Sequence, residues 1–225
     1  MITVDVIVPT FNSGGLLNET LDSVAAQTMR PQRIVVVDDG STDDAVEPAV
    51  ADRPNLTLLR QPNNGLAMAC NNGVVESTAE AFIILDHDDL LAPKAIESLA
   101  VAMNANRGVQ LVYGMVHEFI DGRGGLPEGV RLEEQTLAAR LGGCTLVRRE
   151  LWDLVDGLNP TLSYGVWIDW IDRATHVGAK TLNVPEVILH RRIHAKNFTG
   201  GEQEPTSYLN VARAALARKR NDSNP

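Results

Sequence analysis

Cysteine and long apolar runs are scarce in this chain. Its two cysteines, Cys70 and Cys144, stand in unrelated contexts, so they indicate neither a metal-binding framework nor an obvious disulfide. The apolar runs fall far short of the roughly 20 residues that a membrane-spanning helix needs. The first residues, MITVDVIVP, contain neither the basic segment nor the cleavage site of a secretory signal. We therefore expect no integral membrane span and a protein of the reducing cytoplasm.

Positive charge is also in deficit. The chain has 20 Lys and Arg residues against 29 Asp and Glu residues, a formal net charge of −9. An acidic chain is a poor candidate for binding a nucleic-acid backbone or an anionic membrane, so we expect no nucleic-acid partner. A local basic patch near the end of the chain can still hold a small anion: Arg191, Arg192, His194, Lys196, Arg213, Arg218, Lys219 and Arg220.

Strand-like and helix-like segments alternate in the first half of the chain. Short β-branched or apolar runs predict strands at 4–9, 33–37, 56–60, 81–85 and 110–114. The stretches between them predict helices at 15–28, 65–77 and 93–106, and a short helix after Asp43 that Pro48 compromises. Such alternation is typical of an α/β fold, in which helices cover both faces of a parallel sheet.

The alternation breaks after about residue 115. Residues 121–129 (DGRGGLPEG) read as a glycine-rich turn or mobile loop. The later pattern predicts strands at 144–148, 181–184 and 187–191, and helices at 167–177 and 206–220. We therefore expect a smaller α+β portion after the parallel sheet, within a chain long enough for one sizeable globular domain.

Polar residues follow four of the predicted strands, at the point where each strand ends. In open parallel sheets, ligands bind beyond the carboxyl ends of the strands. Asp, Asn, Gly and Ser also favour turns, so turn formation alone explains any one of these groups. Four groups on one edge favour a binding site: Pro9-Thr10-Phe11-Asn12, Asp38-Asp39-Gly40-Ser41, Asn63-Asn64-Gly65 and Asp86-His87-Asp88-Asp89.

The aspartates of this edge suit different tasks. Asp86 and Asp88 are two residues apart where a strand enters a turn, so their side chains point to the same side. Together they can hold a hard cation, Mg²⁺ or Mn²⁺, that keeps open positions for phosphate oxygens. Asp39 can accept a hydrogen bond from the imide N–H of a nucleobase, while Asp38 can cap the turn at Gly40-Ser41.

Five segments stand in a fixed order along most of the chain. They are VIVPTFN (6–12), VDDGSTDD (37–44), NNGLAMACNNG (63–73), LDHDD (85–89) and PEVILHRRIHAKN (185–197). Together they resemble the inverting GT-A glycosyltransferases of family 2, and a VDDGSTD segment followed by a DxD-type motif is a specific combination. The resemblance implies a Rossmann-like nucleotide-sugar-binding sheet flanked by helices. It also implies a donor-binding half at 1–114, an acceptor-side half at 115–200, and a C-terminal helix and tail at 201–225.

The resemblance assigns roles at the donor site. In the family, the segment that matches Pro9, Thr10, Phe11 and Asn12 lines the nucleotide site, with the residue at Phe11 near the base. The acid that matches Asp39 binds a uracil-type base, which favours a UDP-type donor. The pair at Asn64 and Gly65 approaches the nucleotide. The acids at Asp86 and Asp88 hold the ribose and the divalent metal, Mn²⁺ or Mg²⁺, and Asp86 is also a candidate second metal ligand.

The diphosphate contacts that the resemblance implies are less complete. Arg192 and His194 resemble late basic elements that approach the diphosphate or the metal in some relatives, where positive charge stabilises the leaving nucleoside diphosphate. Family members often place an Arg or Lys in the third helix, facing the diphosphate. Here the matching positions hold Met68 and Cys70.

The catalytic base is the largest departure from the family. An inverting transferase needs a carboxylate that takes a proton from the acceptor, and much of the family carries Glu-Asp just before a helix for this task. Val166 and Trp167 hold the matching positions here, so Asp169 is our candidate base. One alternative is that Asp169 only caps the helix or pairs with Arg173 four residues later. Another is an acceptor, such as a thiol or a phosphate, that needs no strong base.

The predicted function is metal-dependent, inverting transfer of a sugar from a nucleoside-diphosphate donor. The missing Glu-Asp pair also fits a nucleotide-sugar-binding protein with weak or no activity. Nucleotidyl transfer uses a related sheet, but the loop PTFNSGG lacks the basic residues that usually hold a triphosphate. The expected acceptor is a small molecule, a peptide or a glycan, since the chain lacks the membrane span of a processive polysaccharide synthase. The pattern does not indicate an oligomeric state.

Overall fold

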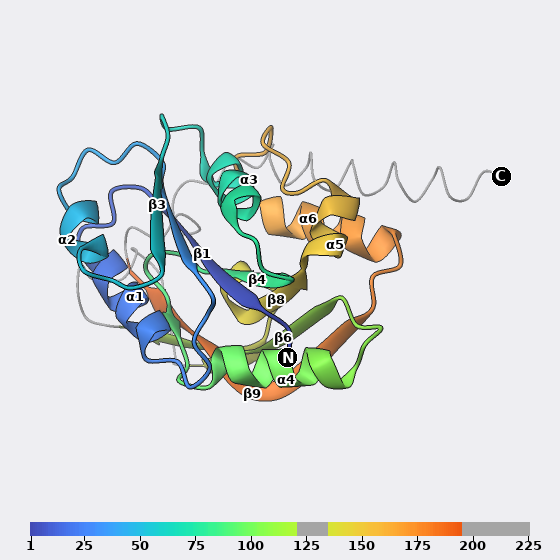
Figure 1. Ribbon diagram of the computed structural model, residues 1–225. Coiled ribbons are helices and arrows are strands. Elements are labelled where there is room, and N and C mark those ends of the chain that lie inside the picture. The colour runs from blue at the N-terminus through green and yellow to red at the C-terminus, as the bar shows by residue number, and fades with distance from the viewer. Residues whose placement is uncertain (121–134, 195–225) are drawn as a thin grey trace.

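One side of the sheet consists of four parallel strands. The computed structural model describes residues 1–120 and 135–194 (Figure 1). Strands β1 (Val4–Thr10), β2 (Ile34–Asp38), β3 (Leu56–Arg60) and β4 (Ala81–Ile84) lie in the order β3-β2-β1-β4. Every residue of β1, β2 and β4 is buried, as expected of parallel strands that are covered on both faces.

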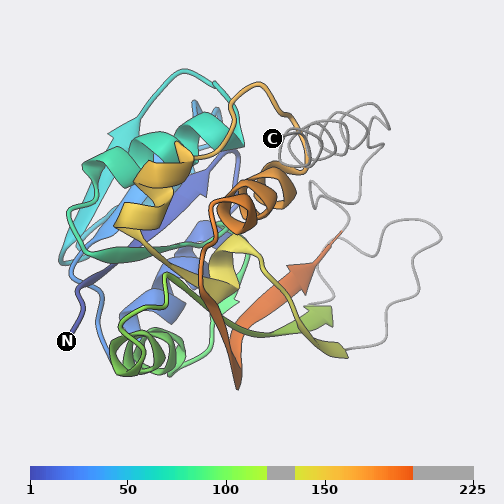
Figure 2. The ribbon, with the colours of Figure 1, turned by 90° about the vertical axis from the view of Figure 1, so that its right-hand side faces the viewer.

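Helices pack on both faces of this sheet, as Figures 1 and 2 show. Helices α1 (Leu16–Ala25), α2 (Val46–Val50) and α4 (Ala95–Ala105) share one apolar core with the sheet. Helices α3 (Leu66–Glu76), α5 (Arg149–Val155) and α6 (Val166–His176) share the other. Along β1, Val6 and Val8 belong to the first core and Ile7 to the second, because successive side chains of a strand point to opposite faces.

The later strands make the sheet mixed, beyond the parallel strands that the sequence predicted in the first half of the chain. Strand β8 (Thr145–Arg148) pairs antiparallel with both β4 and β6 (Leu111–Ile120), and β6 pairs parallel with β9 (Thr181–Ile193). The short strands β5 (Leu90–Leu91) and β7 (Gln135–Ala138) pair antiparallel with β9 and β6. Since β4, β6 and β9 therefore run in one direction, their carboxyl ends lie on the same edge as those of β1, β2 and β3.

Most predicted elements form close to their predicted limits. Pro48 is tolerated as the third residue of α2, because N–H groups of the first helical turn have no partner within the helix. The two strands predicted at 181–184 and 187–191 are one strand, β9. Pro185 falls where its pairing with β6 shifts register, between Tyr113 and Met115, as expected of a residue without an N–H donor.

The sheet is continuous across the boundary predicted between residues 1–114 and 115–200, which falls within β6. The division into a donor half and an acceptor half stays a prediction. The loop at 121–129, the helix at 206–220 and the tail lie outside the described residues, as does Lys196. Within residues 1–120 and 135–194, no helix has both the length and the apolar character needed to cross a membrane.

Asp5 links three segments at the edge of the sheet where the parallel strands begin, opposite the edge with the polar residues. It is fully buried and accepts hydrogen bonds from the N–H of Arg33 (2.9 Å) and the hydroxyl of Ser77 (2.8 Å). The N–H groups of Thr78 and Ala79 donate to the same carboxylate. Asp5 therefore joins the start of β1 to the segments that lead into β2 and β4.

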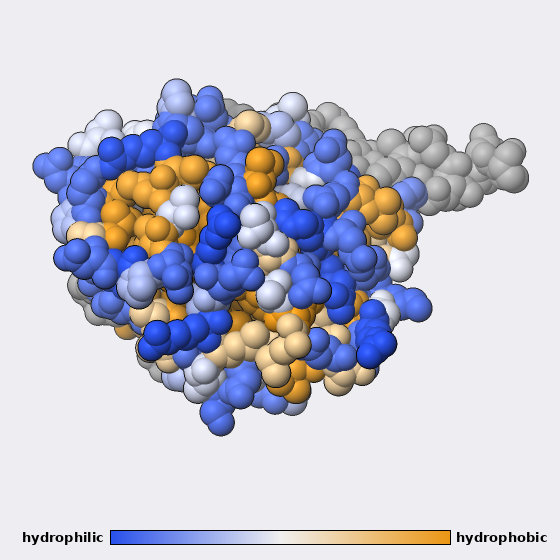
Figure 3. All heavy atoms as spheres, viewed as in Figure 1, coloured by the Kyte–Doolittle hydropathy of each residue, from blue (hydrophilic) through white to orange (hydrophobic). Residues whose placement is uncertain are grey.

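Strand β3 is one edge of the sheet, and apolar side chains gather over β3 and α2 in Figure 3. Leu56 and Leu58 are partly buried against the first apolar core. The strand ends at Arg60, an exposed cation. A charged residue on an edge strand discourages pairing with another chain.

Candidate active site

The turn after β2 holds two aspartates with different partners. The carboxylate of Asp38 accepts a hydrogen bond from the N–H of Ser41 (2.9 Å), which confirms the predicted cap of the turn. Gly40 has a φ of 78°, and a Cβ at this position would lie 2.9 Å from the backbone nitrogen of Asn63. The turn therefore requires glycine, and the loop after β3 packs directly against it.

Asp39 fixes the loop that leads into α3. Its carboxylate accepts hydrogen bonds from the side chain of Gln61 (2.7 Å) and from the N–H groups of Asn64 (2.8 Å) and Gly65 (2.9 Å). The structure thus brings together three residues that the sequence assigned to the nucleotide site. A carboxylate has about four acceptor positions, so one is left for a ligand. Contact between Asp39 and a nucleobase stays a prediction.

The loop after β1 is tied to the loop after β2. Asn12 adopts a left-handed backbone conformation (φ 49°), its N–H donates to the hydroxyl of Ser41 (3.1 Å), and its side-chain oxygen accepts from the N–H of Thr42 (2.8 Å). Pro9 and Thr10 are buried at the end of β1, whereas the Phe11 side chain is 42% exposed. An exposed aromatic ring between two fixed loops is a suitable surface for stacking a base.

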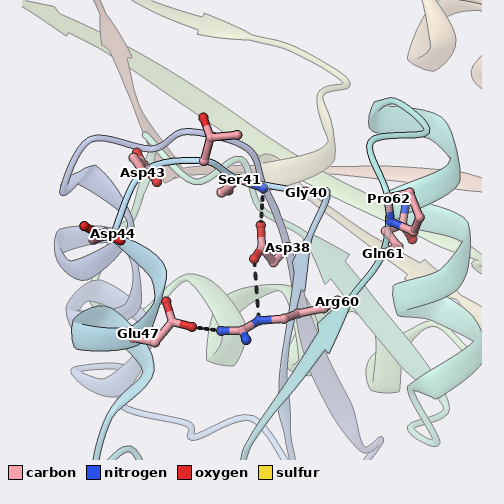
Figure 4. A pocket seen from close by; sticks show the side chains of 10 residues that line it. Asp38, Gly40, Ser41, Asp43, Asp44, Glu47, Arg60, Gln61 and Pro62 are labelled. Atoms are coloured by element: carbon pink, nitrogen blue, oxygen red, sulfur yellow. Dashed lines mark hydrogen bonds and ion pairs between the residues drawn. The ribbon is translucent and has the colours of Figure 1, made fainter.

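A cleft of about 430 Å³ adjoins these loops (Figure 4). Its walls are the segment that leads from β2 into α2 and the end of β3. In Figure 4, Arg60 lies between Asp38 and Glu47 and forms ion pairs with both. The lining contains none of the residues predicted to bind the donor, although Ser41 and Thr42 contact Asn12 and Gln61 contacts Asp39.

The acidic segment after β4 meets the end of β9. Oδ2 of Asp88 lies 3.0 Å from Nε2 of His194. Asp89 is buried and accepts a hydrogen bond from the N–H of Arg192 (2.8 Å), while the hydroxyl of Thr20 on α1 donates to the backbone oxygens of His87 and Asp89. The segment is thus held between α1 and β9, and Asp88 faces His194.

Desolvation and mutual repulsion both raise the pKa values of the aspartates in this segment. Desolvation by the surrounding protein atoms and the neighbouring charge of Asp88 raise the pKa of Asp86 to about 7, although its side chain stays accessible to water. Burial and the charges of Asp88 and Asp86 raise the pKa of Asp89 well above its usual range. The positive charge of Arg191 partly offsets both effects. A bound cation would relieve the same repulsion.

Arg192 lies beneath the acidic segment. The side chain is 1% exposed, its Nε donates to the backbone oxygen of Asp88 (2.9 Å), and its terminal nitrogen pairs with Glu19 on α1 (2.8 Å). Its guanidinium also lies over the ring of Phe119, 5.1 Å from the ring centre. These contacts position Asp88. A direct contact between Arg192 and a diphosphate stays a prediction.

Helix α3 carries a neutral side chain at the position of Cys70. Burial, the charge of Asp86 and the charge of Asp39 raise the pKa of the Cys70 thiol, so the thiol stays protonated. Cys70 and Cys144 are both free and buried. Helix α3 therefore offers no positive charge at the matching position.

Asp169 is held away from water on α6. It is 2% exposed and pairs with Nε of Arg173 (2.8 Å), the arrangement that the sequence offered as an alternative to a catalytic role. Arg173 also donates to the backbone oxygens of Val155 and Gly157 at the end of α5. The ion pair therefore stabilises the packing of two helices, and Asp169 as a base stays a prediction.

Trp167 places the start of α6 near the donor edge. A Cβ on Gly142 would lie 2.6 Å from both the Trp167 ring and the backbone oxygen of Ile84, the last residue of β4. The ring thus packs beside the strand that leads to Asp86. The sequence did not reveal this proximity, nor the roles of Glu19 and Thr20 in supporting the acidic segment, because these pairs are far apart in the chain.

The sequence is similar to those of known glycosyltransferases. The sequence model of glycosyl transferase family 2 matches residues 5–154, two thirds of the chain. An uncharacterized glycosyltransferase of Rickettsia prowazekii, RP339, is 26% identical over 87% of this chain and 65% of its own length. Chondroitin synthase of Pasteurella multocida is 27% identical over 96% of this chain and 23% of its own length. The chain thus spans less than two thirds of these relatives.

Solved structures share the fold. TarS of S. aureus, residues 1–349 in complex with UDP-GlcNAc, superposes with a TM-score of 0.79 at 19% identity. The similarity covers 96% of this chain and 66% of that one. It confirms the predicted α/β GT-A fold.

Proposed function

The chain belongs to glycosyltransferase family 2, and from this membership we propose that it transfers a sugar from a nucleoside-diphosphate donor to an acceptor. We propose a uridine-type donor, dependence on a divalent metal, and inversion at the sugar carbon. The observation that carries the proposal is the convergence of Asp88 and His194 at 3.0 Å, on the edge where Asp39 fixes Asn64 and Gly65. Ligands of open α/β sheets bind at this edge.

The donor set at Asp88 and His194 fits a divalent cation. One carboxylate oxygen and one imidazole nitrogen face each other, and Asp86 is exposed two residues before Asp88. Imidazole suits Mn²⁺ better than Mg²⁺, which prefers oxygen ligands. Within the described residues no cluster of three His, Cys, Asp or Glu side chains forms a metal site, so donor oxygens and water would complete the coordination. When bound, the cation stabilises negative charge on the leaving diphosphate.

The remaining roles fall to residues around this centre. Phe11 stacks on the base and Asp39 accepts its imide N–H, while the exposed carboxylate of Asp86 hydrogen-bonds the ribose. Asp169 is the candidate that takes the acceptor proton as the acceptor oxygen attacks the sugar carbon and the bond to the diphosphate breaks. For that step, Asp169 would have to become accessible and exchange its contact with Arg173.

Donor binding tests the proposal directly. We expect UDP to bind in calorimetry more tightly with Mn²⁺ than with Mg²⁺ or EDTA, and UDP-GlcNAc to be slowly hydrolysed in the presence of Mn²⁺. UDP and UDP-GlcNAc are the first probes because S. aureus TarS, which shares this fold, was crystallised with each. Failure of UDP, GDP, CDP and ADP to bind with any divalent metal would refute the proposal.

A second candidate function is binding of a nucleotide sugar without transfer. It is favoured by Val166 and Trp167 at the positions of the usual Glu-Asp pair, and by the buried Asp169–Arg173 ion pair. It predicts metal-dependent UDP binding without hydrolysis of UDP-GlcNAc and without sugar transfer to added acceptors. The relatives that are polysaccharide synthases are much longer than this chain, so our expectation of a small-molecule, peptide or glycan acceptor stays a prediction.

A further inference from the structure

Glu118 and Arg191 form an ion pair where β6 and β9 end. They are direct neighbours in the register of the two strands, and a terminal nitrogen of Arg191 lies 2.8 Å from Oε1 of Glu118. Gln135 on β7 donates to the other carboxylate oxygen at 2.7 Å. Glu118 is buried, whereas the Arg191 side chain is 25% exposed. Neither Glu118 nor Arg191 has a role in the sugar transfer as proposed for this protein.

Arg191 stands close to the acidic edge. It lies on β9 three residues before His194, and the next residue back, His190, pairs with Leu90 directly after Asp89. Arg191 is therefore near the end of β9, on the edge of the sheet where a diphosphate would bind.

Two other positions near this edge do not offer a cation to a diphosphate: Arg192 holds other groups of the protein, and helix α3 carries neutral residues. Arg192 is almost fully buried and holds Glu19 and the backbone of Asp88. Helix α3 carries Met68 and Cys70 where relatives often place a cation. A diphosphate brought beside three aspartates needs positive charge in addition to His194 and a metal, because like charges at this separation repel strongly.

We propose that Arg191 binds the diphosphate of the donor, and that Glu118 holds Arg191 in place while the donor is absent. Donor binding exchanges a carboxylate oxygen of Glu118 for a phosphate oxygen on the same guanidinium. Carboxylate and phosphate both match the planar donors of arginine, so the exchange conserves the hydrogen bonds of Arg191. Gln135 remains on Glu118 and prevents its charge from being left without a partner. This inference rests on the proposed function, since it requires a diphosphate at this edge.

The two members of the pair should respond in opposite directions. We expect Arg191→Gln to weaken UDP binding about 10-fold or more in the presence of Mn²⁺, as for the loss of a hydrogen bond to a charged group. UMP should lose less affinity, because it lacks the second phosphate. Glu118→Gln removes the competing carboxylate, so UDP should bind as tightly as to the wild type or more tightly. Calorimetry on the full 225-residue chain measures each value.

A matched ion pair serves as the control. Arg53 and Asp22 also lie 2.8 Å apart, but they join the turn after α2 to α1 and do not lie at the donor edge. Arg53→Gln and Asp22→Asn should leave UDP affinity within twofold of wild type. Thermal unfolding of every variant distinguishes a lost ligand contact from a loss of folded protein.

Two results would overturn the inference while leaving the proposed function intact. The first is wild-type UDP affinity in Arg191→Gln. The second is weakening of UDP binding in both variants, in step with their loss of stability, which would mean that the pair is only structural. If the wild-type protein binds no nucleoside diphosphate at all, the proposed function fails and this inference fails with it.

Discussion

His194 and Asp88 are 106 residues apart in the chain, yet Nε2 of the histidine lies 3.0 Å from Oδ2 of the aspartate. Strand β9 creates this contact by running parallel to β6 and pairing with β5, which begins directly after Asp89. Arg192 reinforces it from below through the backbone oxygen of Asp88. Two potential metal ligands from distant segments are therefore held on one edge of the sheet before a donor arrives.

Replacing either ligand should remove the effect of metal on donor binding. We expect Asp88→Asn and His194→Ala each to reduce UDP affinity in Mn²⁺ about 10-fold or more, the usual consequence of losing a metal ligand or its support. Without metal, Asp88→Asn should bind UDP at least as tightly as the metal-free wild type does. Calorimetry in Mn²⁺ and in EDTA provides the comparison. Undiminished binding of UDP with Mn²⁺ to Asp88→Asn would show that the cation binds elsewhere.

Asp39 should be more sensitive to substitution than its neighbour Asp38. In Asp39→Asn, an amide nitrogen replaces one acceptor oxygen and faces an N–H donor of the 61–65 loop. We expect a loss of about 1–3 kcal/mol in unfolding free energy, together with weaker UDP binding. Asp38→Asn keeps an oxygen for Ser41 and should cost less than about 1 kcal/mol. Equal urea-unfolding curves for the two variants would contradict this ranking.

Asp5 should matter for stability and not for donor recognition. Asp5→Ala leaves the N–H groups of Arg33, Thr78 and Ala79 and the hydroxyl of Ser77 without their buried acceptor. We expect a destabilisation of about 2–4 kcal/mol, measured by urea unfolding. Below the transition, the UDP affinity of the folded variant should equal that of wild type. An affinity change in fully folded protein would reveal coupling between the two edges of the sheet.

Asp169 can be tested by separating its charge from its ion pair. If Asp169 is the base, Asp169→Asn should lower UDP-GlcNAc turnover by about 100-fold or more, and Arg173→Gln should preserve most of the turnover. If the residue only stabilises α6, both variants should lose stability to a similar extent and show parallel changes in turnover. UDP affinity should stay at the wild-type level in either case, because the ion pair of Asp169 and Arg173 joins α6 to the end of α5.

Local pattern was sufficient to predict the first part of the fold. Each of the four parallel strands is a short apolar run followed by turn residues, so β1, β2, β3 and β4 could be located without knowledge of the tertiary structure. The same signal is weak for β5, which has two residues, and for β7, whose four residues are all exposed. The pairing of β5 depends on β9, which lies far away in the sequence.

The candidate site divides in a similar way. Asp39, Asp86 and Asp88 follow strands directly, so sheet geometry alone predicted that they share an edge. Arg192 was predicted to approach the diphosphate, but the sequence did not reveal that its side chain is buried and paired with Glu19. The charge of a residue indicates which ligand it favours and can be read from the sequence. Whether the residue is available to bind that ligand depends on its burial and its contacts, which the sequence does not reveal.

The acidic segment should make the metal-free protein sensitive to pH. Burial and Asp88 raise the pKa of Asp86 to about 7, above its value in the unfolded chain, so the folded state retains a proton that the unfolded state releases. The contribution of Asp86 to stability is then greatest below the unfolded pKa, near 4, and is lost as the pH rises toward about 7. We expect the unfolding temperature in EDTA to decrease over this range, and Asp86→Asn to make the decrease smaller. Because Asp86 is accessible to water, the decrease in unfolding temperature should be modest. UDP with Mn²⁺ should suppress the decrease by neutralising the acidic segment. An unfolding temperature that rises steadily from pH 4 to 7 in EDTA, with no difference between wild type and Asp86→Asn, would contradict this account.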